Sequence, residues 1–146
     1  MRSVIGEIVG GTNEVTVLDM EASIEHLSRG TIRHVDVLLV VLEPYYRSME
    51  TAGRTVPLAR DLGIGRIFGI ANKLRTPQDE EAVRTYCANH DLELIAGIPF
   101  DESVVEADRT ARAVIDYDAN SAIVTELSKV ADFLMPNAAG AGNGGN

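Results

Sequence analysis

Cysteine, long apolar runs and an apolar leader are scarce or missing in this sequence. Cys87 is the single cysteine, so no disulfide can form within the chain, and such sparing use of cysteine favours a reducing compartment. The longest apolar run, residues 37–42, is far shorter than the ~20 residues that a membrane-spanning helix needs. Residues 1–7 are too few and too polar for a signal peptide. We therefore expect a cytoplasmic protein.

Positive charge is also in short supply. The chain has 13 Lys and Arg against 22 Asp and Glu, which gives a formal net charge of −9. Nonspecific binding to nucleic acid requires clustered positive charge, and anionic membrane surfaces attract basic segments. The charge balance therefore argues against nucleic acid and against a membrane as partners.

The composition is that of one folded domain. With 146 residues, 45% of them hydrophobic, and a mean hydropathy of +0.02, the chain is long enough to bury a core. We assign residues 1–135 to a single domain. Residues 136–146 are rich in Ala, Gly and Asn, and we expect them to be a disordered tail because they have little to bury.

Strand and helix patterns alternate along the chain with short links. Residues 36–42 form a continuous aliphatic strand, which is typical of the centre of a parallel sheet because both faces are apolar. Further strands are predicted at 14–18, 66–71 and 92–98, and helices at 48–62, 76–90, 102–112 and 121–134. The alternation predicts an α/β fold with a doubly wound, mainly parallel sheet of about four strands and flanking helices.

Local signals mark three of the helix ends. Ser48 is a candidate N-cap, and Gly63 is a candidate stop because glycine accepts the left-handed conformation at a helix end. Thr76 and Pro77 predict the start of the next helix, with the threonine as cap and the proline at the first position.

Residues 15–27 are the stretch around which the chain is organised. A short β-branched run ends at Asp19, and a carboxylate-rich loop follows. The carboxyl ends of parallel strands open onto the ligand crevice, where an acid can hold Mg²⁺ through water. Glu21, Glu25 and His26 could act as acid, base or ligand to a softer metal. Each of these residues alone also fits a solvated loop, and Asp19 also fits a cap for the next turn.

Two other predicted strand ends carry polar residues. Asn72 and Lys73 follow one strand, and the Asn72 amide offers a donor and an acceptor to a nucleobase edge. Pro99, Phe100 and Asp101 follow the last strand, where the bend exposes backbone groups that could line a flat aromatic ligand. Asn72 alone also fits a turn residue, and Pro99 a strand terminator. By the crevice rule the three strand ends converge on one edge of the sheet.

Three segments carry a resemblance to a known family. Residues 19–27 read D-M-E-A-S-I-E-H-L, residues 70–73 read I-A-N-K, and residues 98–101 read I-P-F-D. Together they resemble the C-terminal part of a P-loop ATPase of the MinD, ParA and nitrogenase-iron-protein type. The first segment is similar to the switch II segment D-[ML]-E-A-G-[IL]-E-H-L of the CooC-type branch, the accessory ATPases for nickel insertion into carbon monoxide dehydrogenase. The similarity runs over residues 15–134.

The resemblance implies a role for each candidate residue. Asp19 would coordinate Mg²⁺ through water, and the Ser23 N–H would sense the γ-phosphate, which makes these two the candidate catalytic residues. The nucleotide, ATP or ADP, would be held by the residues at the other two strand ends: Asn72, Lys73, Pro99, Phe100 and Asp101. The switch and the contact with a metalloenzyme client would involve Glu21, Glu25 and His26.

The sequence departs from that family in its phosphate-binding elements. Ser23 stands where the family has a glycine, and serine resists a positive φ. The sequence contains no G-x-x-x-x-G-K-[ST], the Walker A pattern whose backbone and lysine hold the phosphates, and residues 10–12 (G-G-T) are not followed by the lysine. The paired cysteines of the CooC-type branch are also missing. We therefore expect no hydrolysis by this chain alone; the alternative is a non-enzymatic interaction module derived from a decayed ATPase half.

The missing phosphate loop also affects the expected sheet. In the family, the strand leading into that loop lies between the strand that ends at Asp19 and the strand at 36–42. Without it, either these two strands pair directly or a second chain fills the slot, because an open central strand exposes unpaired backbone groups. We expect a homo-oligomer or a P-loop-bearing partner chain.

Overall fold

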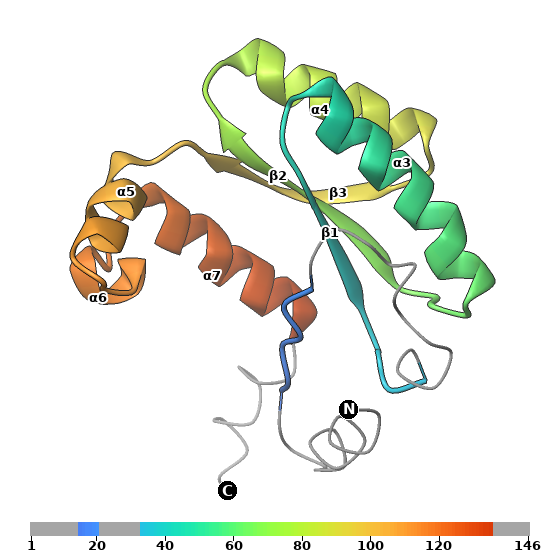
Figure 1. Cartoon of the computed structure of the whole chain (residues 1–146), viewed down its shortest axis with the longest axis horizontal. Helices are drawn as coiled ribbons and strands as arrows, with labels where there is room; N and C mark the ends of the chain where they lie inside the picture. Colours follow the sequence, from blue (N-terminus) through green and yellow to red (C-terminus); the bar gives the residue numbers. More distant parts are fainter. Residues whose placement is uncertain (1–14, 21–32, 136–146) are drawn as a thin grey trace, which may run out of the picture.

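Three parallel strands form the centre of the fold (Figure 1). The computed structural model describes residues 15–20 and 33–135. In that part the strands are β1 (Leu38–Leu42), β2 (Ile67–Leu74) and β3 (Glu93–Pro99), in the spatial order β1-β2-β3. The helices are α3 (Tyr46–Asp61), α4 (Pro77–Asn89), α5 (Glu102–Arg109), α6 (Val114–Tyr117) and α7 (Ala122–Leu134). The predicted α/β fold, with a parallel sheet and flanking helices, is confirmed.

β2 is the central strand of this sheet. It pairs in parallel with β1 in an unbroken register over all five residues of β1. Its pairing with β3 is also parallel but has irregularities after Gly69 and after Ala71. At the first of these, a Cβ on Gly69 would lie 3.2 Å from the Leu92 side chain. A larger residue at this position would require the Leu92 side chain to shift by a few tenths of an ångström.

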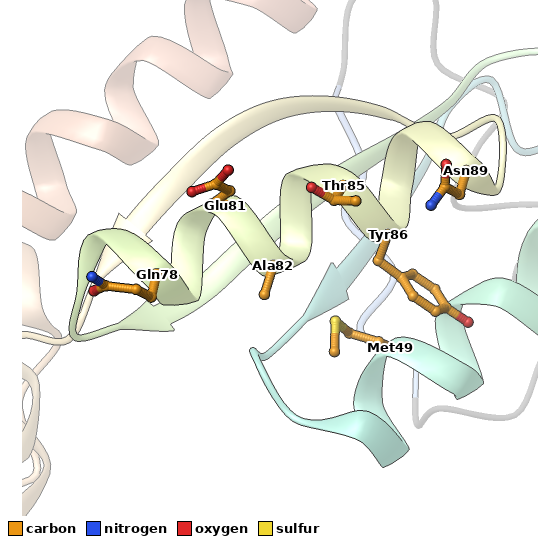
Figure 2. Close-up of a pocket in the computed structure, with 7 residues that line it drawn as sticks. All are labelled: Met49, Gln78, Glu81, Ala82, Thr85, Tyr86 and Asn89. Atoms are coloured by element: carbon orange, nitrogen blue, oxygen red, sulfur yellow. The ribbon is translucent and has the colours of Figure 1, made fainter.

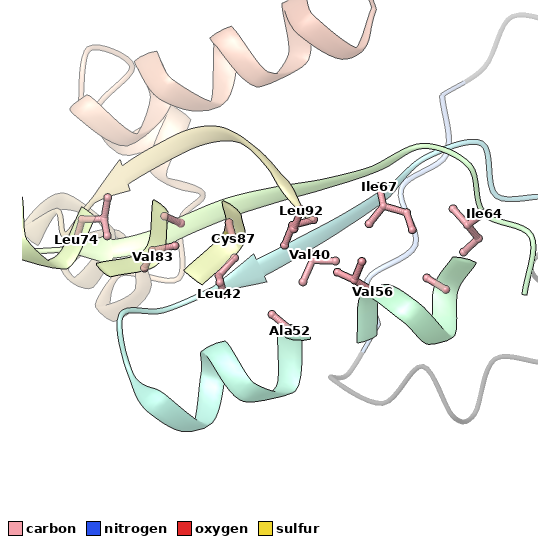
Figure 3. Close-up of a cluster of buried hydrophobic side chains, with 12 residues drawn as sticks. Val40, Leu42, Ala52, Val56, Ile64, Ile67, Leu74, Val83, Cys87 and Leu92 are labelled. Carbon is pink, nitrogen blue, oxygen red and sulfur yellow. The ribbon is translucent and has the colours of Figure 1, made fainter. Parts of the chain in front are cut away.

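The larger core lies between the sheet and helices α3 and α4, which cover the same face (Figure 1, Figure 3). Its least exposed large side chains are Leu42, Val56, Val83 and Cys87. The rest of this core consists of Val40, Ala52, Ala59, Ile64, Ile67, Ala71, Leu74 and Leu92. Burial raises the pKa of the Cys87 thiol, so this cysteine is protonated at neutral pH and serves packing.

Helix α7 covers the opposite face over β2 and β3. Val130 packs with Ile70 and Ile98, and the Phe133 ring meets the Phe68 ring edge-on, with 5.1 Å between centroids. Toward β1 this cover thins: Leu39 is half-buried against the same cluster, whereas Val41 is 58% exposed. Helices thus lie on both faces of the sheet, as the doubly wound pattern predicts, but this face of β1 is bare at Val41.

The strand predicted at 14–18 is wrong for the residues that the structure describes. Residues 15–18 have an irregular backbone, and Val15 and Val17 are 68% and 85% exposed. A strand is stable only when a neighbour takes up its backbone hydrogen bonds. Direct pairing of this segment with β1 is not formed, so the first of the two alternatives for the open slot is not what the structure adopts.

The helix predicted at 102–112 ends earlier, at Arg109, and the short α6 was not predicted. Of the two signals predicted for α3, the one at its end is confirmed and the one at its start is wrong. Gly63 has φ +95° and donates to Arg60 O at 2.9 Å, while Ile64 N–H donates to Ala59 O at 3.0 Å, which is the expected glycine stop. Ser48 is not the N-cap, because α3 begins two residues earlier and its N-cap is Tyr45. Ser48 Oγ instead accepts a hydrogen bond from Glu43 N–H at 2.8 Å and joins the end of β1 to α3.

Thr76 and Pro77 begin α4 as predicted. Thr76 Oγ1 accepts from Asp79 N–H at 3.2 Å, and Asp79 Oδ2 accepts from Thr76 N–H at 3.1 Å. This reciprocal arrangement is a capping box. Residues 136–146, expected to be disordered, lie outside the described residues. Among the described helices, none is both long and apolar enough to cross a membrane.

The two faces of β1 predict different costs of truncation. Leu42→Ala removes a fully buried side chain and should lower the free energy of unfolding by about 2–5 kcal/mol. Val41→Ala, one residue away on the bare face, should cost less than about 1 kcal/mol. Urea unfolding followed by circular dichroism measures both variants. Equal losses would mean that the Val41 face is covered in solution.

Candidate functional site

The ends of β1, β2 and β3 lie at the carboxyl edge of the sheet. Two of the three predicted strand ends, Asn72–Lys73 and Pro99–Asp101, meet there, whereas Asp19 does not end a strand. Lys73 Nζ, at the end of β2, lies 2.6 Å from Glu43 Oε1, just after β1. Phe100 N–H, just after β3, donates to Leu74 O at 2.8 Å. The structure therefore brings Asn72, Lys73 and the segment after β3 together. Glu43 was not predicted as a site residue, although its place directly after an apolar strand is the same signal that selected Asp19.

Lys73 occupies a strained backbone position. Its φ is +56°, and it lies in the irregular stretch between Ala71 and Leu74 in the pairing of β2 with β3. The sequence predicted that the strand would end at Asn72 and Lys73; instead β2 continues to Leu74. A left-handed non-glycine residue costs about 1 kcal/mol or more, and bulges commonly redirect a side chain beside a functional site.

A cation and an aromatic ring are stacked at this edge. The Arg75 guanidinium carbon lies 3.8 Å from the centroid of the Phe100 ring. The backbone N–H of Arg75 donates to Asp79 Oδ2 at 2.9 Å. The stack forms a flat, positively charged platform, because arginine lies parallel to aromatic faces. Sequence reasoning selected Phe100 but missed Arg75, since no local pattern pairs residues that follow different strands.

The Asp101 carboxylate joins the first turns of two helices. Its Oδ1 accepts from Ser103 N–H at 2.9 Å and from Ser103 Oγ at 2.5 Å, and its Oδ2 accepts from Ile123 N–H at 3.4 Å. The Ser103 hydroxyl, followed by the Ser103 N–H, lowers the pKa of Asp101. Both carboxylate oxygens are engaged, so Asp101 holds the turn beside Phe100 through its links to α5 and α7.

Of the predicted Mg²⁺ and switch residues, the structure describes Asp19, which is exposed in the irregular residues 15–20. Glu21, Ser23, Glu25 and His26 lie outside the described residues. Within residues 15–20 and 33–135, no group of three His, Cys, Asp or Glu side chains is arranged to hold a metal ion. A single carboxylate with water and phosphate oxygens is a coordination that Mg²⁺ accepts, so Asp19 fits as one ligand.

The hollows that the described part contains lie elsewhere. An open groove of about 380 Å³ runs between α3 and α4, with Met49 on one side and Ala82 and Tyr86 on the other (Figure 2). None of the predicted site residues lines it. This groove is therefore not the candidate site.

The comparisons with known proteins show homologues of this chain. No family model matches the chain. The carbon monoxide dehydrogenase accessory protein CooC of Rhodospirillum rubrum is 41% identical over 116 residues, which cover 80% of this chain and 43% of CooC. This chain is a homologue of CooC. An uncharacterized ATP-binding protein of Methanocaldococcus jannaschii is 33% identical over 136 residues, or 92% of this chain and 51% of that protein.

Solved structures show the same fold. A ParA family ATPase from Chlorobium tepidum matches with a TM-score of 0.63 at 22% identity, over 75% of this chain and 46% of that one. MinD of Aquifex aeolicus matches with a TM-score of 0.64 at 19% identity, over 77% and 49%. The chain thus has a partial MinD/ParA-type P-loop NTPase fold, as its resemblance predicts. It spans about half, or less, of the length of the curated relatives it matches.

The hydrogen bonds of Asp101 predict a pH-dependent stability. Asp101→Ala removes the cap of α5 and the link to α7, and at pH 7 it should cost about 1–2 kcal/mol of unfolding free energy. Because the pKa of Asp101 is lowered in the folded state, this contribution is complete above the ordinary aspartate pKa and is lost as the pH falls through the lowered value. Urea midpoints from pH 7 down to pH 2 measure the difference between wild type and variant.

A second aspartate of the same helix provides the control. Asp108 is exposed in α5, so Asp108→Ala should leave the midpoint nearly unchanged at every pH. If the loss on Asp101→Ala stayed constant down to pH 2, the charge of the carboxylate would play no part in joining the two helices.

Proposed function

We propose that this chain is the nucleobase-facing part of a CooC-type ATPase, a nucleotide-dependent switch that serves the assembly of a metal centre. The observation that carries the proposal is the 41% identity with CooC over 116 residues. That relative is named a carbon monoxide dehydrogenase accessory protein, which supports an accessory role toward a metalloenzyme. Nickel insertion is the finer form of the same proposal.

The carboxyl edge has the chemistry to bind an adenine base. Asn72 is half-buried beside the strained Lys73, and its amide can donate to and accept from a base edge at once. The platform of Arg75 and Phe100 offers a face on which a purine can stack. Beside this platform, the charges of Lys73 and Glu43 neutralise each other.

The phosphates of ATP, the substrate, would meet fewer groups on this chain. Asp19 would hold Mg²⁺ through water, and the Ser23 N–H would face the γ-phosphate. Glu21, Glu25 and His26 would couple the nucleotide state to a client. The sequence contains no Walker A pattern, and this loop supplies most of the N–H contacts to a triphosphate. We therefore propose that hydrolysis requires a phosphate loop from outside this sequence.

A second candidate function is a non-enzymatic interaction module. The observation that favours it is the same absence of a Walker A pattern, together with the exposed apolar side chain of Val41 on β1. In that case the carboxyl edge would keep its fold without binding a nucleotide. The two candidates differ in whether the base site works.

Base binding without phosphate binding gives a distinctive result. We expect adenosine and MgATP to bind with similar dissociation constants on the order of millimolar, because only the base is recognised. Two-dimensional NMR titration should show shifts centred on Asn72, Arg75 and Phe100. Micromolar binding of MgATP would reveal a phosphate site that the sequence analysis missed, and the absence of shifts up to about 10 mM adenosine would favour the interaction module.

Two arginine variants separate the effect of stacking on adenosine binding from the effect of removing one positive charge. Arg75→Ala should weaken adenosine binding several-fold, since base–aromatic and cation–π stacking contribute about 1–3 kcal/mol per base. Arg84→Ala is the matched control, because Arg84 is also exposed and pairs with Glu80 on α4. If both variants bound adenosine like the wild type, the platform would not be the base site.

A further inference from the structure

Asn72 and Lys73 form a β-bulge at the carboxyl end of β2. Together they lie opposite the single residue Ile98 of β3, and two residues opposite one is the pattern of a bulge. The pairs that flank them are Ala71 with Gly97 and Leu74 with Pro99. Lys73 has the left-handed φ of +56°, so the turn of the backbone in the bulge falls on a residue that is not glycine.

The bulge keeps the Lys73 side chain out of the core. In a regular strand, residues two apart share a face, so Lys73 would lie on the face of Ala71, which belongs to the core beneath α3 and α4. In the structure Leu74 joins that core instead, and the Lys73 side chain is 54% exposed. A buried ammonium without a partner is strongly unfavourable. The extra residue therefore places the leucine inside and the lysine outside.

Glu43 holds the lysine of this bulge from the neighbouring strand end. A non-glycine residue keeps a left-handed backbone only where its surroundings determine it, and Lys73 Nζ lies 2.6 Å from Glu43 Oε1. The Glu43 backbone is fixed on both sides. Its N–H donates to Ser48 Oγ at 2.8 Å, and its carbonyl oxygen accepts from Tyr45 N–H at 2.8 Å. The carboxylate of a fixed and half-buried residue thus supports the Lys73 side chain.

The two ends of the bulge are held in different ways. After it, the buried Leu74 accepts a hydrogen bond at its carbonyl oxygen from Phe100 N–H, at 2.8 Å, so the core fixes this end. Within it, the ion pair with Glu43 is a contact of partly exposed side chains. Such a pair contributes little to the stability of a whole domain. Its loss would therefore loosen Lys73, and Asn72 directly before it, without unfolding the chain.

We propose that Glu43 is a positioning residue for nucleobase recognition. Through its ion pair with Lys73 it holds the bulge in the conformation in which the Asn72 amide meets the base. The proposal rests on the function proposed above, because the base is the ligand that Asn72 would recognise. Glu43 acts through Lys73 and does not touch the base itself, and Ser48 acts one step earlier by fixing Glu43.

Glu43→Gln tests this role, because it keeps the shape of the side chain and removes its charge. A looser bulge populates the binding conformation less, which raises the apparent dissociation constant in the same proportion. NMR titration should show adenosine binding about 2–5-fold more weakly to the variant, while the melting temperature falls by less than about 4 °C. In the spectrum without ligand, the side-chain amide signals of Asn72 should move.

Lys73→Gly provides a rescue that a merely structural role would not show. Glycine adopts a positive φ without a supporting partner, so Lys73→Gly should bind adenosine like the wild type. In that background, adding Glu43→Gln should change neither the binding nor the Asn72 signals. Glu50→Gln is the matched control, because Glu50 is also partly exposed and lies 2.7 Å from Arg54 in α3. It should leave adenosine binding unchanged.

The outcomes separate this proposal from the function on which it rests. Equal adenosine binding by the wild type and Glu43→Gln would overturn the positioning role and leave the proposed function intact. Lost binding in Lys73→Gly would also overturn it, since Lys73 would then contact the ligand directly. If the wild type bound no adenosine up to about 10 mM, the proposed function would fail. The support of Asn72 by Glu43 would then be decided by the ligand-free spectra, and Asn72 signals that ignore Glu43→Gln would overturn it.

Discussion

The parallel hydrogen bonding of β2 to both of its neighbours is the constraint on which the described structure depends. β2 is the one strand with a partner on each side, and it contributes Ile67, Ala71 and Leu74 to one core and Ile70 to the other. Helices α3, α4 and α7 are stable because they cover the two faces of this strand and its neighbours. The candidate site depends on β2 as well, since its carboxyl end places Asn72 and Lys73 between the other two strand ends.

The same constraint explains why β1 differs from β2. A strand that is apolar on both faces needs a neighbour at each edge and a layer on each face. Among the described strands β1 has one neighbour, and the layer over its second face reaches Leu39 but not Val41. Its sequence was interpreted as a central strand, and the structure places it at an edge with Val41 in solvent. The apolar pattern of β1 therefore predicts a sheet with more strands than the described residues form. A larger sheet agrees with the length of the relatives, which are about twice as long as this chain.

Features set by neighbouring residues could be predicted from the sequence. Gly63 ends α3 and Thr76 caps α4 because each acts on groups within one turn. The strand at 14–18 could not be predicted, because a strand depends on a partner that the local pattern does not reveal. Asn72 and Phe100 could be selected as site residues because each follows a predicted strand. The stack of Arg75 on Phe100 could not be predicted, because it depends on how two separate loops meet.

The prediction of Ser48 as an N-cap was wrong for a similar reason. Its side chain has the chemistry of a cap, but α3 starts earlier because Tyr45 takes the extended conformation of the N-cap. Ser48 then binds Glu43 N–H across the turn. Glu43 is thereby held near Lys73, so a residue predicted to begin a helix instead shapes the candidate site. Contacts of this kind, between separate elements of the fold, could not be predicted from the sequence.

Amide hydrogen exchange at β1 tests the central claim, an open sheet edge beside a complete central strand. Leu38 N–H donates to Arg66 O, before β2, and backbone groups alternate in direction along a strand. The amides of Val40 and Leu42 therefore point to β2, and those of Leu39 and Val41 point to the free edge. In the chain alone we predict slow exchange at Val40 and Leu42 and fast exchange at Leu39 and Val41. Equal protection at all four amides would contradict the account, because it would mean that the edge is already paired.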